Sequence, residues 1–294
     1  MNKEDKEKIL QAGKILAEVR GYAKSIVNKD MPLVEIADKI EEKMFELGAK
    51  PAFPTCLSIN EIAAHYIPYH DDKTLAHGLL KIDLGVHIDG WIADTAFSID
   101  LEDNEENKKL IKASEEAVEN VIKKIKKGVQ IREIGKTVYE TVESFGFSPI
   151  INLFGHQIKR YDLHSDISIP NFDNNNNNTL PKGLYAIEPH VTSGNGKIYD
   201  GKPSATYLLI DEKNVRSPIA REILKYIIEE YKTLPFCSRW LVKKFGTKAL
   251  IGLKQLNEND NIRNYSVLIE TSGKNVAQTE HTILVDDEVI VTTR

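Results

Sequence analysis

Two aspartates in the stretch 81–96 give the first sign of chemistry. The chain there reads Lys-Ile-Asp-Leu-Gly-Val-His-Ile-Asp-Gly-Trp-Ile-Ala-Asp-Thr-Ala, with apolar, β-branched runs on both sides of the central Asp-Gly. Asp-Gly suits a two-residue type I′ turn, so this stretch predicts a β-hairpin. With Asp89 and Gly90 as the turn, Gly85 lies opposite Asp94, and Asp83 shares their face of the hairpin.

The carboxylates of Asp83 and Asp94 are then diagonal neighbours, about 7–8 Å apart at the backbone. Two like charges inside an apolar hairpin are unfavourable unless a proton or a cation compensates them. Gly85 leaves room between the two side chains, and a divalent metal ion is the natural compensator. The alternative is that both aspartates face water on an edge hairpin.

Three residues further along the chain are also of the metal-ligand type. His156 follows Phe-Gly, Glu188 stands in Ala-Ile-Glu-Pro, and Glu280 stands in Ala-Gln-Thr-Glu-His-Thr. Each occupies a strand-like context where an apolar residue would pack at lower cost. Any one of them could be an exposed strand end or a paired core charge. Added to the aspartate pair, however, they form a set of oxygen and nitrogen ligands that suits two hard-to-borderline divalent ions.

Composition limits the other possibilities. The chain has 294 residues, of which 41% are hydrophobic and 28% charged, as in ordinary globular proteins. A net charge of −5 gives no electrostatic case for nucleic acid or an anionic membrane as the main partner. No apolar run approaches the ~20 residues of a membrane span. The charged N-terminus lacks a signal-peptide core, and two cysteines are too few for a disulfide framework, so we expect a cytoplasmic protein.

The order of the predicted elements repeats once. Apolar periodicity predicts helices at 4–28 and 32–47, followed by a strand at 53–59 and the hairpin at 79–99. A second pair of helices, 105–127 and 131–145, precedes strands at 153–156, 183–190 and 204–210. The region 217–256 is helical and locally basic, typical of solvated helix faces, and strands return at 265–269, 278–285 and 289–292. The pattern indicates an α+β domain of two related halves with a helical insertion, and the asparagine run 174–178 is read as a loop without chemistry.

Several motifs resemble those of the methionine aminopeptidases. They are the hairpin sequence, Gly-His-Gln-Ile, Tyr-Asp-Leu-His, Ile-Glu-Pro and Gln-Thr-Glu-His-Thr, in the family's order over almost the full chain. The form is similar to type II without the eukaryotic N-terminal extension, as in archaea. The resemblance implies the pita-bread fold, with two pseudo-symmetric α+β halves around a dinuclear metal site. It further implies a catalytic domain at 1–204 and 266–294 and an inserted helical subdomain at 205–265.

The resemblance also assigns roles to residues. The family's five metal ligands correspond to Asp83, Asp94, His156, Glu188 and Glu280. In the family pattern Asp94 and Glu280 bridge both ions, Asp83 completes one, and the other two ligands complete the second. The cofactor implied is a pair of divalent ions, cobalt, manganese, iron or zinc.

Substrate residues follow from the same motifs. His65 and His164 correspond to histidines that position the peptide and stabilise charge on its carbonyl oxygen, with Glu188 as general base. Phe53, Leu163 and Tyr265 correspond to walls of the methionine pocket.

The activity implied is removal of an N-terminal methionine when the second residue is small, with nascent polypeptides as substrates. Contact with the ribosome stays open, a monomer is expected, and no membrane or specific nucleic-acid partner is. Because the chain begins Met1-Asn2 and asparagine exceeds the size limit, we expect it to retain its own Met1.

Two departures from the family pattern stand out. Asp166 follows the second histidine closely, where it is expected to raise the pKa of His164, and His190 stands where an aromatic residue is common. Prolidases and aminopeptidases P share the fold and the ligand types, although they usually carry a further N-terminal domain. A non-catalytic pita-bread binding protein is the other alternative, which the five retained ligands disfavour.

Overall fold

The computed structural model describes residues 2–126 and 128–294. Met1 and the expected helix end at 127 lie outside these ranges. The helices are α1 Lys3–Ile26, α2 Leu33–Glu46, α3 Glu105–Lys124, α4 Ile131–Ser144, α5 Pro218–Glu230, α6 Ser238–Phe245 and α7 Lys248–Glu258. The strands are β1 Lys50–Pro51, β2 Cys56–Ile59, β3 Ile62–Ala64, β4 Leu79–Ile88, β5 Trp91–Asp100, β6 Ser148–Pro149, β7 Gly155–Ile158, β8 Ser168–Ile169, β9 Gly183–Ile187, β10 His190–Thr192, β11 Ile198–Leu209, β12 Phe236–Cys237, β13 Ile262–Glu270, β14 Val276–Gln278, β15 His281–Val285 and β16 Val289–Val291.

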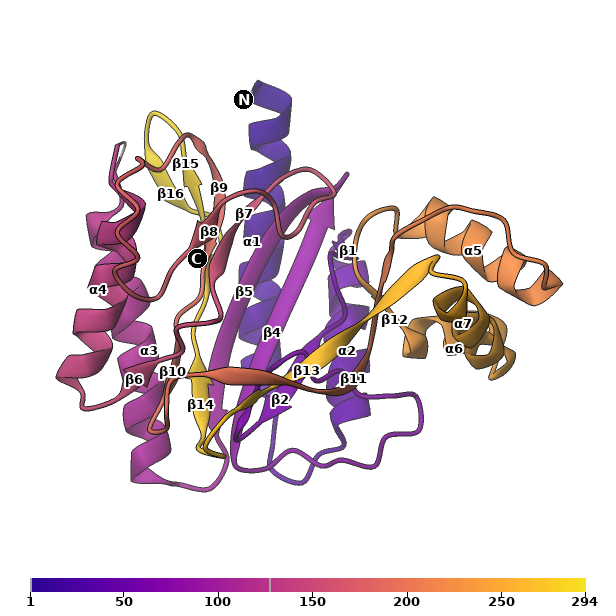
Figure 1. Ribbon diagram of the computed structural model, residues 1–294, viewed down its shortest axis with the longest axis horizontal. Helices are drawn as coiled ribbons and strands as arrows, with labels where there is room; N and C mark the ends of the chain where they lie inside the picture. Colours follow the sequence, from indigo (N-terminus) through magenta and orange to yellow (C-terminus); the bar gives the residue numbers. More distant parts are fainter. Residues whose placement is uncertain (1, 127) are drawn as a thin grey trace.

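The first half is built on the β4–β5 hairpin. Its turn is Asp89-Gly90, both at positive φ, and Ile88 pairs with Trp91, so the predicted register is confirmed. Strands β1 and β2 pair with β4, and helices α1 and α2 lie behind the sheet (Figure 1). Their apolar faces form one hydrophobic cluster with the strands, which fixes the hairpin from one side.

The second half repeats this plan. A sheet in the order β16-β15-β9-β7-β8 has β9 at its centre, and helices α3 and α4 lie beside it at the left of the view (Figure 1). A second hydrophobic cluster joins the two helices to the strands. The expected repeat of helix pair and strands is therefore present.

Helices α5–α7 follow β11 and precede β13 in the chain, and they lie together at the right of the view in Figure 1. The two strands pair with each other, and the helices enclose a hydrophobic cluster of their own. The prediction of a solvated basic face was wrong for one residue here. Arg239 is 1% exposed and forms ion pairs with Asp38 and Glu41 of α2. The guanidinium thus joins the helical segment to the first half, because a buried charge needs such partners.

Two expected strands are each broken in the structure. The segment 183–190 divides at Glu188-Pro189 into β9 and β10, and the segment 278–285 divides at Thr279-Glu280 into β14 and β15. In both cases the two pieces pair within different sheets. Among the described helices, none combines the length and apolar character needed to cross a bilayer.

Candidate metal centre and peptide pocket

The hairpin places Asp83 and Asp94 as its register predicts. Gly85 pairs with Asp94, and Cys56 of β2 pairs with Asp83. The space above Gly85 is filled by the ring of Phe53, since a Cβ on this glycine would lie 2.2 Å from the ring. Gly85 therefore makes room for a pocket wall rather than for an ion.

Strand β9 brings the other three candidate ligands together. His156 on β7 pairs with Ala186 of β9, and His281 on β15 pairs with Ile187. Glu188 and Glu280 stand next to these paired positions, at the breaks that end β9 and precede β15. Neighbouring strands thus deliver an imidazole and two carboxylates to one edge of the sheet.

Hydrogen bonds join this edge to the hairpin. Asp94 donates its N–H to the hydroxyl of Thr282 over 2.7 Å, and that hydroxyl donates back to the Asp94 carbonyl. Thr95 donates to the carbonyl of Glu280 at 2.7 Å. These contacts fix the backbones of Asp94 and Glu280 next to each other, from two halves far apart in sequence.

The side chains converge on one point. Asp94, His156 and Glu280 each present a ligand atom, and these atoms lie within 4.8 Å of one another. His156 Nε2 is 3.8 Å from Asp94 Oδ2 and 3.5 Å from Glu188 Oε1. Asp83 lies close by, because the Gln278 amide donates to Asp83 at 3.4 Å and to Glu188 at 3.5 Å. All five predicted ligands thus meet.

Burial dominates the electrostatics of this cluster. Burial raises the pKa of Asp83 to about 7 and the pKa values of Asp94, Glu188 and Glu280 well above the ordinary value, and for the last three neighbouring carboxylates add to the rise. Burial also lowers the pKa of His156 to about 4, so its imidazole is neutral. A neutral imidazole beside repelling carboxylates is the state that a divalent cation stabilises.

The residues present fit a metal group. Asp83 Oδ1, Asp94 Oδ1 and Glu280 Oε1 are buried and, among the described residues, have no hydrogen-bond partner. Buried oxygens of this kind are costly unless a ligand satisfies them. Four carboxylates and one imidazole form an oxygen-rich donor set that suits manganese, iron, cobalt or zinc.

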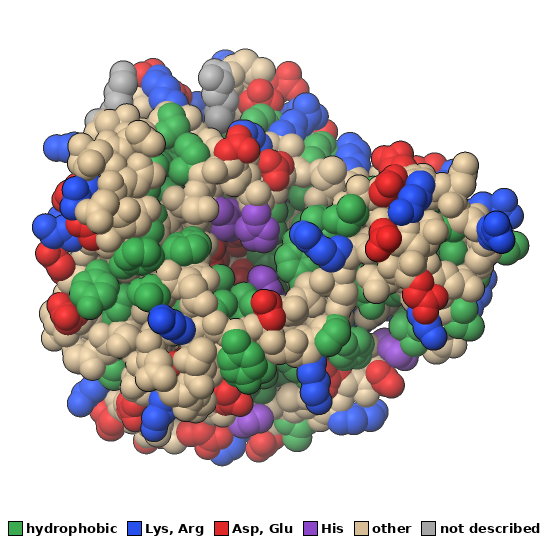
Figure 2. Space-filling model, viewed as in Figure 1, with side chains coloured by type: hydrophobic (Ala, Val, Ile, Leu, Met, Phe, Trp, Pro, Cys, Tyr) green, Lys and Arg blue, Asp and Glu red, His purple; other side chains and the backbone are tan. Residues whose placement is uncertain are grey.

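A cavity of about 420 Å³ opens onto this cluster, and every predicted site residue lines it. Figure 2 shows histidine and acidic side chains gathered in a hollow on this face, bordered by apolar side chains. The cavity is also lined by residues that the sequence did not single out as site residues, among them Cys56, Ala64, Ile67, Phe154, Thr206 and Pro235. Small and apolar side chains of this kind carry no signal in a single sequence.

Two histidines stand above the metal cluster. His65 follows β3 at φ 65°, and its Nδ1 lies 3.2 Å from the Ser266 carbonyl. The rings of His65 and Tyr265 contact each other edge to face, with their centroids 5.4 Å apart. The rings of His164 and His156 do the same, with their centroids 4.5 Å apart. His164 is accessible from the pocket, yet surrounding protein lowers its pKa well below the ordinary value, with help from His156 and His65. Burial also lowers the pKa of His65, so both imidazoles are neutral near pH 7.

The two departures from the family pattern have different outcomes. The expectation that Asp166 raises the pKa of His164 was wrong, because Asp166 points outward and pairs with Lys159. His190 is fully buried beneath the site, with its Nδ1 3.1 Å from the Glu188 carbonyl. A carbonyl only accepts, so His190 donates there and supports the backbone of Glu188.

Comparison with known proteins decides the family. The model of metallopeptidase family M24 matches residues 7–287. A methionine aminopeptidase from Pyrococcus abyssi is 45% identical over 295 aligned positions, which cover 98% of this chain and 99% of the relative. The chain belongs to the methionine aminopeptidases of metallopeptidase family M24.

Solved structures show that the M24 fold is shared. A methionine aminopeptidase from Thermotoga maritima has a TM-score of 0.73 at 23% identity, covering 100% of this chain and 98% of the other. A prolidase from Pyrococcus furiosus has a TM-score of 0.63 at 18% identity, covering 100% of this chain and 64% of the other. The prediction of the pita-bread fold is confirmed. The curated M24 relatives favour the methionine aminopeptidase reading over the prolidase one.

Proposed function

We propose that the protein removes N-terminal methionine from polypeptides and that the residues around the 420 Å³ cavity perform the reaction. The observation that carries this proposal is the cluster of buried carboxylate oxygens that lack a hydrogen-bond partner among the described residues and belong to side chains lining a pocket with apolar walls. Such a site holds cations next to a space for one side chain, which is the arrangement an aminopeptidase needs.

Two divalent ions are proposed as cofactors. Asp83, Asp94, His156, Glu188 and Glu280 would hold them. Support comes from the mutual proximity of Asp94, His156 and Glu280 and from the raised pKa values of the carboxylates. When bound, such ions supply Lewis-acid polarisation of the peptide carbonyl and lower the pKa of water toward ~7.

Glu188 is proposed as the proton carrier. Its carboxylate lines the cavity, and the Gln278 amide and the imidazole of His156 approach it from two sides. It would take a proton from the attacking water at a carboxylate oxygen and deliver it to the leaving amine. His190 holds its backbone during this transfer.

The tautomers of His65 and His164 give the two residues different roles. His65 Nδ1 faces the Ser266 carbonyl and must donate to it, so in the neutral ring Nε2 is left as an acceptor. We therefore assign Nε2 of His65 to accept a hydrogen bond from a backbone N–H of the peptide on the far side of the scissile bond. Donation to the developing oxyanion of the carbonyl falls to His164, which has no such carbonyl partner among its described hydrogen bonds.

The walls of the pocket account for specificity. Phe53 and Leu163 are 7% and 6% exposed, and Tyr265 closes the same side against His65. An apolar pocket accepts methionine's flexible thioether without branching clashes. One methylene in such a pocket is worth about 1–3 kcal/mol, so leucine is rejected incompletely.

The decisive experiment compares peptides on metal-free protein titrated with manganese, iron, cobalt and zinc. We expect Met-Ala-Ser to be cleaved after addition of metal and Ala-Pro peptides to be spared, whereas the reverse preference would establish a prolidase. Glu188→Gln should still bind methionine, with turnover lowered by about 10²–10⁴. Near-normal turnover of this variant would reject the role of Glu188.

Three further properties belong to the proposal. Residues 205–265 would form the inserted helical subdomain, which the separate hydrophobic cluster of α5–α7 supports. The substrates would be nascent chains in the cytoplasm, where initiator methionine is exposed. We expect a monomer, since the cavity is complete within one chain.

A further inference from the structure

Two hairpins carry three of the five proposed metal ligands. The first is β4–β5 with Asp83 and Asp94. The second folds back from β7, where Ser165 donates its N–H to the Gln157 carbonyl at 2.8 Å and Lys159 donates to the Asp162 carbonyl at 2.9 Å. His156 lies on its first arm, and Leu163 and His164 lie on its second, so both hairpins line the pocket.

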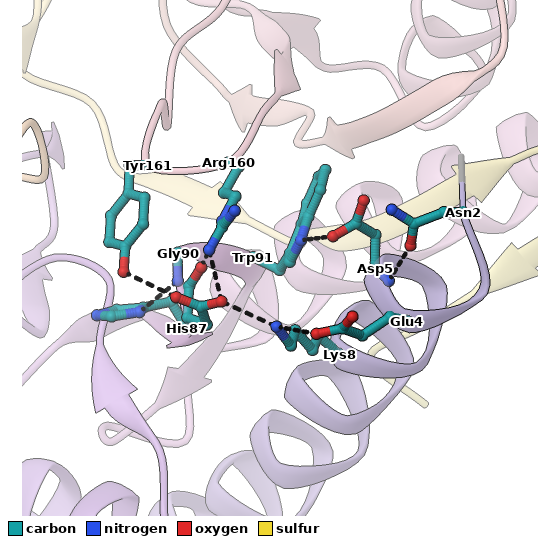
Figure 3. A network of polar contacts seen from close by, with 10 residues as sticks. Asn2, Glu4, Asp5, Lys8, His87, Gly90, Trp91, Arg160 and Tyr161 are labelled. Carbon is teal, nitrogen blue, oxygen red and sulfur yellow. Dashed lines mark hydrogen bonds and ion pairs between the residues drawn. The ribbon is translucent and has the colours of Figure 1, made fainter.

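The tips of these hairpins bind each other (Figure 3), and the residues that do so are not among those that line the pocket. Arg160 donates through Nε to the Asp89 carbonyl at 2.9 Å and through a terminal nitrogen to the Asp89 carboxylate. Tyr161 donates its N–H to the Gly90 carbonyl at 2.8 Å and its hydroxyl to the Asp89 carboxylate at 3.3 Å. We call Asp89, Gly90, Arg160 and Tyr161 the tip clamp.

The backbone of Tyr161 shows that the clamp fixes an unfavourable conformation. Its φ is 57°, an unusual value for a bulky residue, which persists only where the surroundings determine it. Its ring packs on Gly90, where a Cβ would lie 2.3 Å from the ring. On the other side Thr233 donates to the Tyr161 carbonyl, and the Lys232 ammonium lies 3.9 Å from the ring centre.

Charge strengthens the clamp at one point. The Asp89 carboxylate also accepts from Lys8 of α1 at 2.9 Å, so two cations meet on it. Hydrogen bonds from Arg160 and then Lys8 depress the pKa of Asp89 below its ordinary range, which keeps it ionised at neutral pH. The contact therefore unites α1, the first hairpin and the second.

We propose that Asp89 and Arg160 are positioning residues for the methionine pocket, an inference that rests on the proposed function. Asp89 is six residues from Asp83, about 20 Å along a strand, and it does not line the pocket. Leu163 and His164 follow Tyr161 by two and three residues and line the pocket. Because the tip clamp holds Tyr161 in its left-handed conformation, it fixes the positions of the Leu163 and His164 side chains in the pocket.

The test uses the metal-loaded full chain with Asp89→Asn, Arg160→Met and the double variant. Lys159→Met is the matched control, because its side chain is 48% exposed against 47% for Arg160 and it pairs with Asp166 outside the clamp. We expect the Met-Ala-Ser over Leu-Ala-Ser ratio of kcat/KM to fall about three- to tenfold in both clamp variants. The double variant should be no worse than the poorer single one, and Lys159→Met should match the unaltered protein.

Hydrogen exchange gives a readout that needs no turnover. Backbone amides of 157–165 should exchange faster in Asp89→Asn and Arg160→Met than in Lys159→Met, in metal-free and metal-loaded protein alike. If Arg160→Met fails to fold, Arg160→Lys replaces it, since lysine keeps the charge and loses the two-pronged donation.

The possible results distinguish failure of the proposed function from failure of the positioning role. An unaltered, metal-loaded protein that cleaves neither peptide refutes the proposed function. An active protein whose clamp variants keep both the peptide ratio and the exchange rates refutes the positioning role alone. Faster exchange with an unchanged ratio also overturns it, because the clamp would then serve the fold and not the pocket.

Discussion

Gly85→Ala is the sharpest probe of the pocket wall. Gly85 lies on β4, two residues after Asp83. A Cβ added there would lie 2.2 and 2.6 Å from two carbons of the Phe53 ring. Ordinary carbon contacts are about 3.5–4.0 Å, so the ring must move by more than about 1 Å. Phe53 lines the cavity while Gly85 does not, and the ring therefore moves toward the substrate.

The magnitudes follow from this displacement. Overpacking of this kind costs about 1–3 kcal/mol, which for a chain of this size lowers Tm by roughly 2–5 °C. Loss of pocket space comparable to one methylene lowers kcat/KM for methionine peptides by about 10-fold or more, mainly through KM. Metal stoichiometry should stay at its unaltered value, because both aspartates keep their backbone positions.

The assay pairs calorimetric unfolding with Met-Ala-Ser kinetics. Gly21→Ala is the control, since nothing lies within 4 Å of a Cβ added there in α1 and the change should stabilise the helix by about 0.5–1 kcal/mol. Adding Phe53→Leu to Gly85→Ala should recover part of the lost stability by freeing space. Unchanged Tm and KM in Gly85→Ala would refute the conclusion that the Phe53 ring needs a glycine at position 85.

Other predictions test the charges and the size rule. Glu41→Ala leaves buried Arg239 without its main partner and should cost about 3–5 kcal/mol in urea unfolding, whereas Lys243→Ala at the exposed rim should cost less than about 1. Burial raises the pKa of Asp83 to about 7, so metal binding at pH 6 should release protons, and metal affinity should fall as pH falls. Calorimetry of metal binding in two buffers that detects no proton release would contradict this. Asp94→Ala should bind at most one metal by elemental analysis, while His65→Ala binds two and turns over slowly. Met-Ala peptides should be cut far faster than Met-Asn, and intact-mass analysis should find Met1 retained.

Local rules predicted the ligand-bearing hairpin well. Asp-Gly selects one turn type, and period-two alternation then sets which residues share a face, so the pairing of Gly85 with Asp94 could be counted from the sequence. The helices α1 to α4 were likewise found from apolar periodicity. Both signals are short-range and need no knowledge of the rest of the fold.

Long-range features escaped this reasoning. Arg239 looked like part of a solvated basic face, because the carboxylates that neutralise it lie on α2, about two hundred positions earlier in the chain. The expected influence of Asp166 on His164 failed for a similar reason. Nearness in sequence did not decide its partner, since Lys159 across the loop pairs with it instead. Charge partners are a property of tertiary structure.

The two strand breaks show how the fold makes the site and why a single sequence conceals it. Glu188 and Glu280 each sit where a strand leaves one sheet and the chain enters another, so their backbones are free of regular pairing at that point. In an unbroken strand, successive side chains point to opposite faces of the sheet. The position of each glutamate along the strand would then decide whether its side chain is buried or exposed. A break instead lets the chain turn both carboxylates toward the same space, against the hairpin aspartates. The cost of the irregular backbone is offset by specific contacts, the Thr95 hydroxyl on the Glu280 carbonyl and His190 on the Glu188 carbonyl.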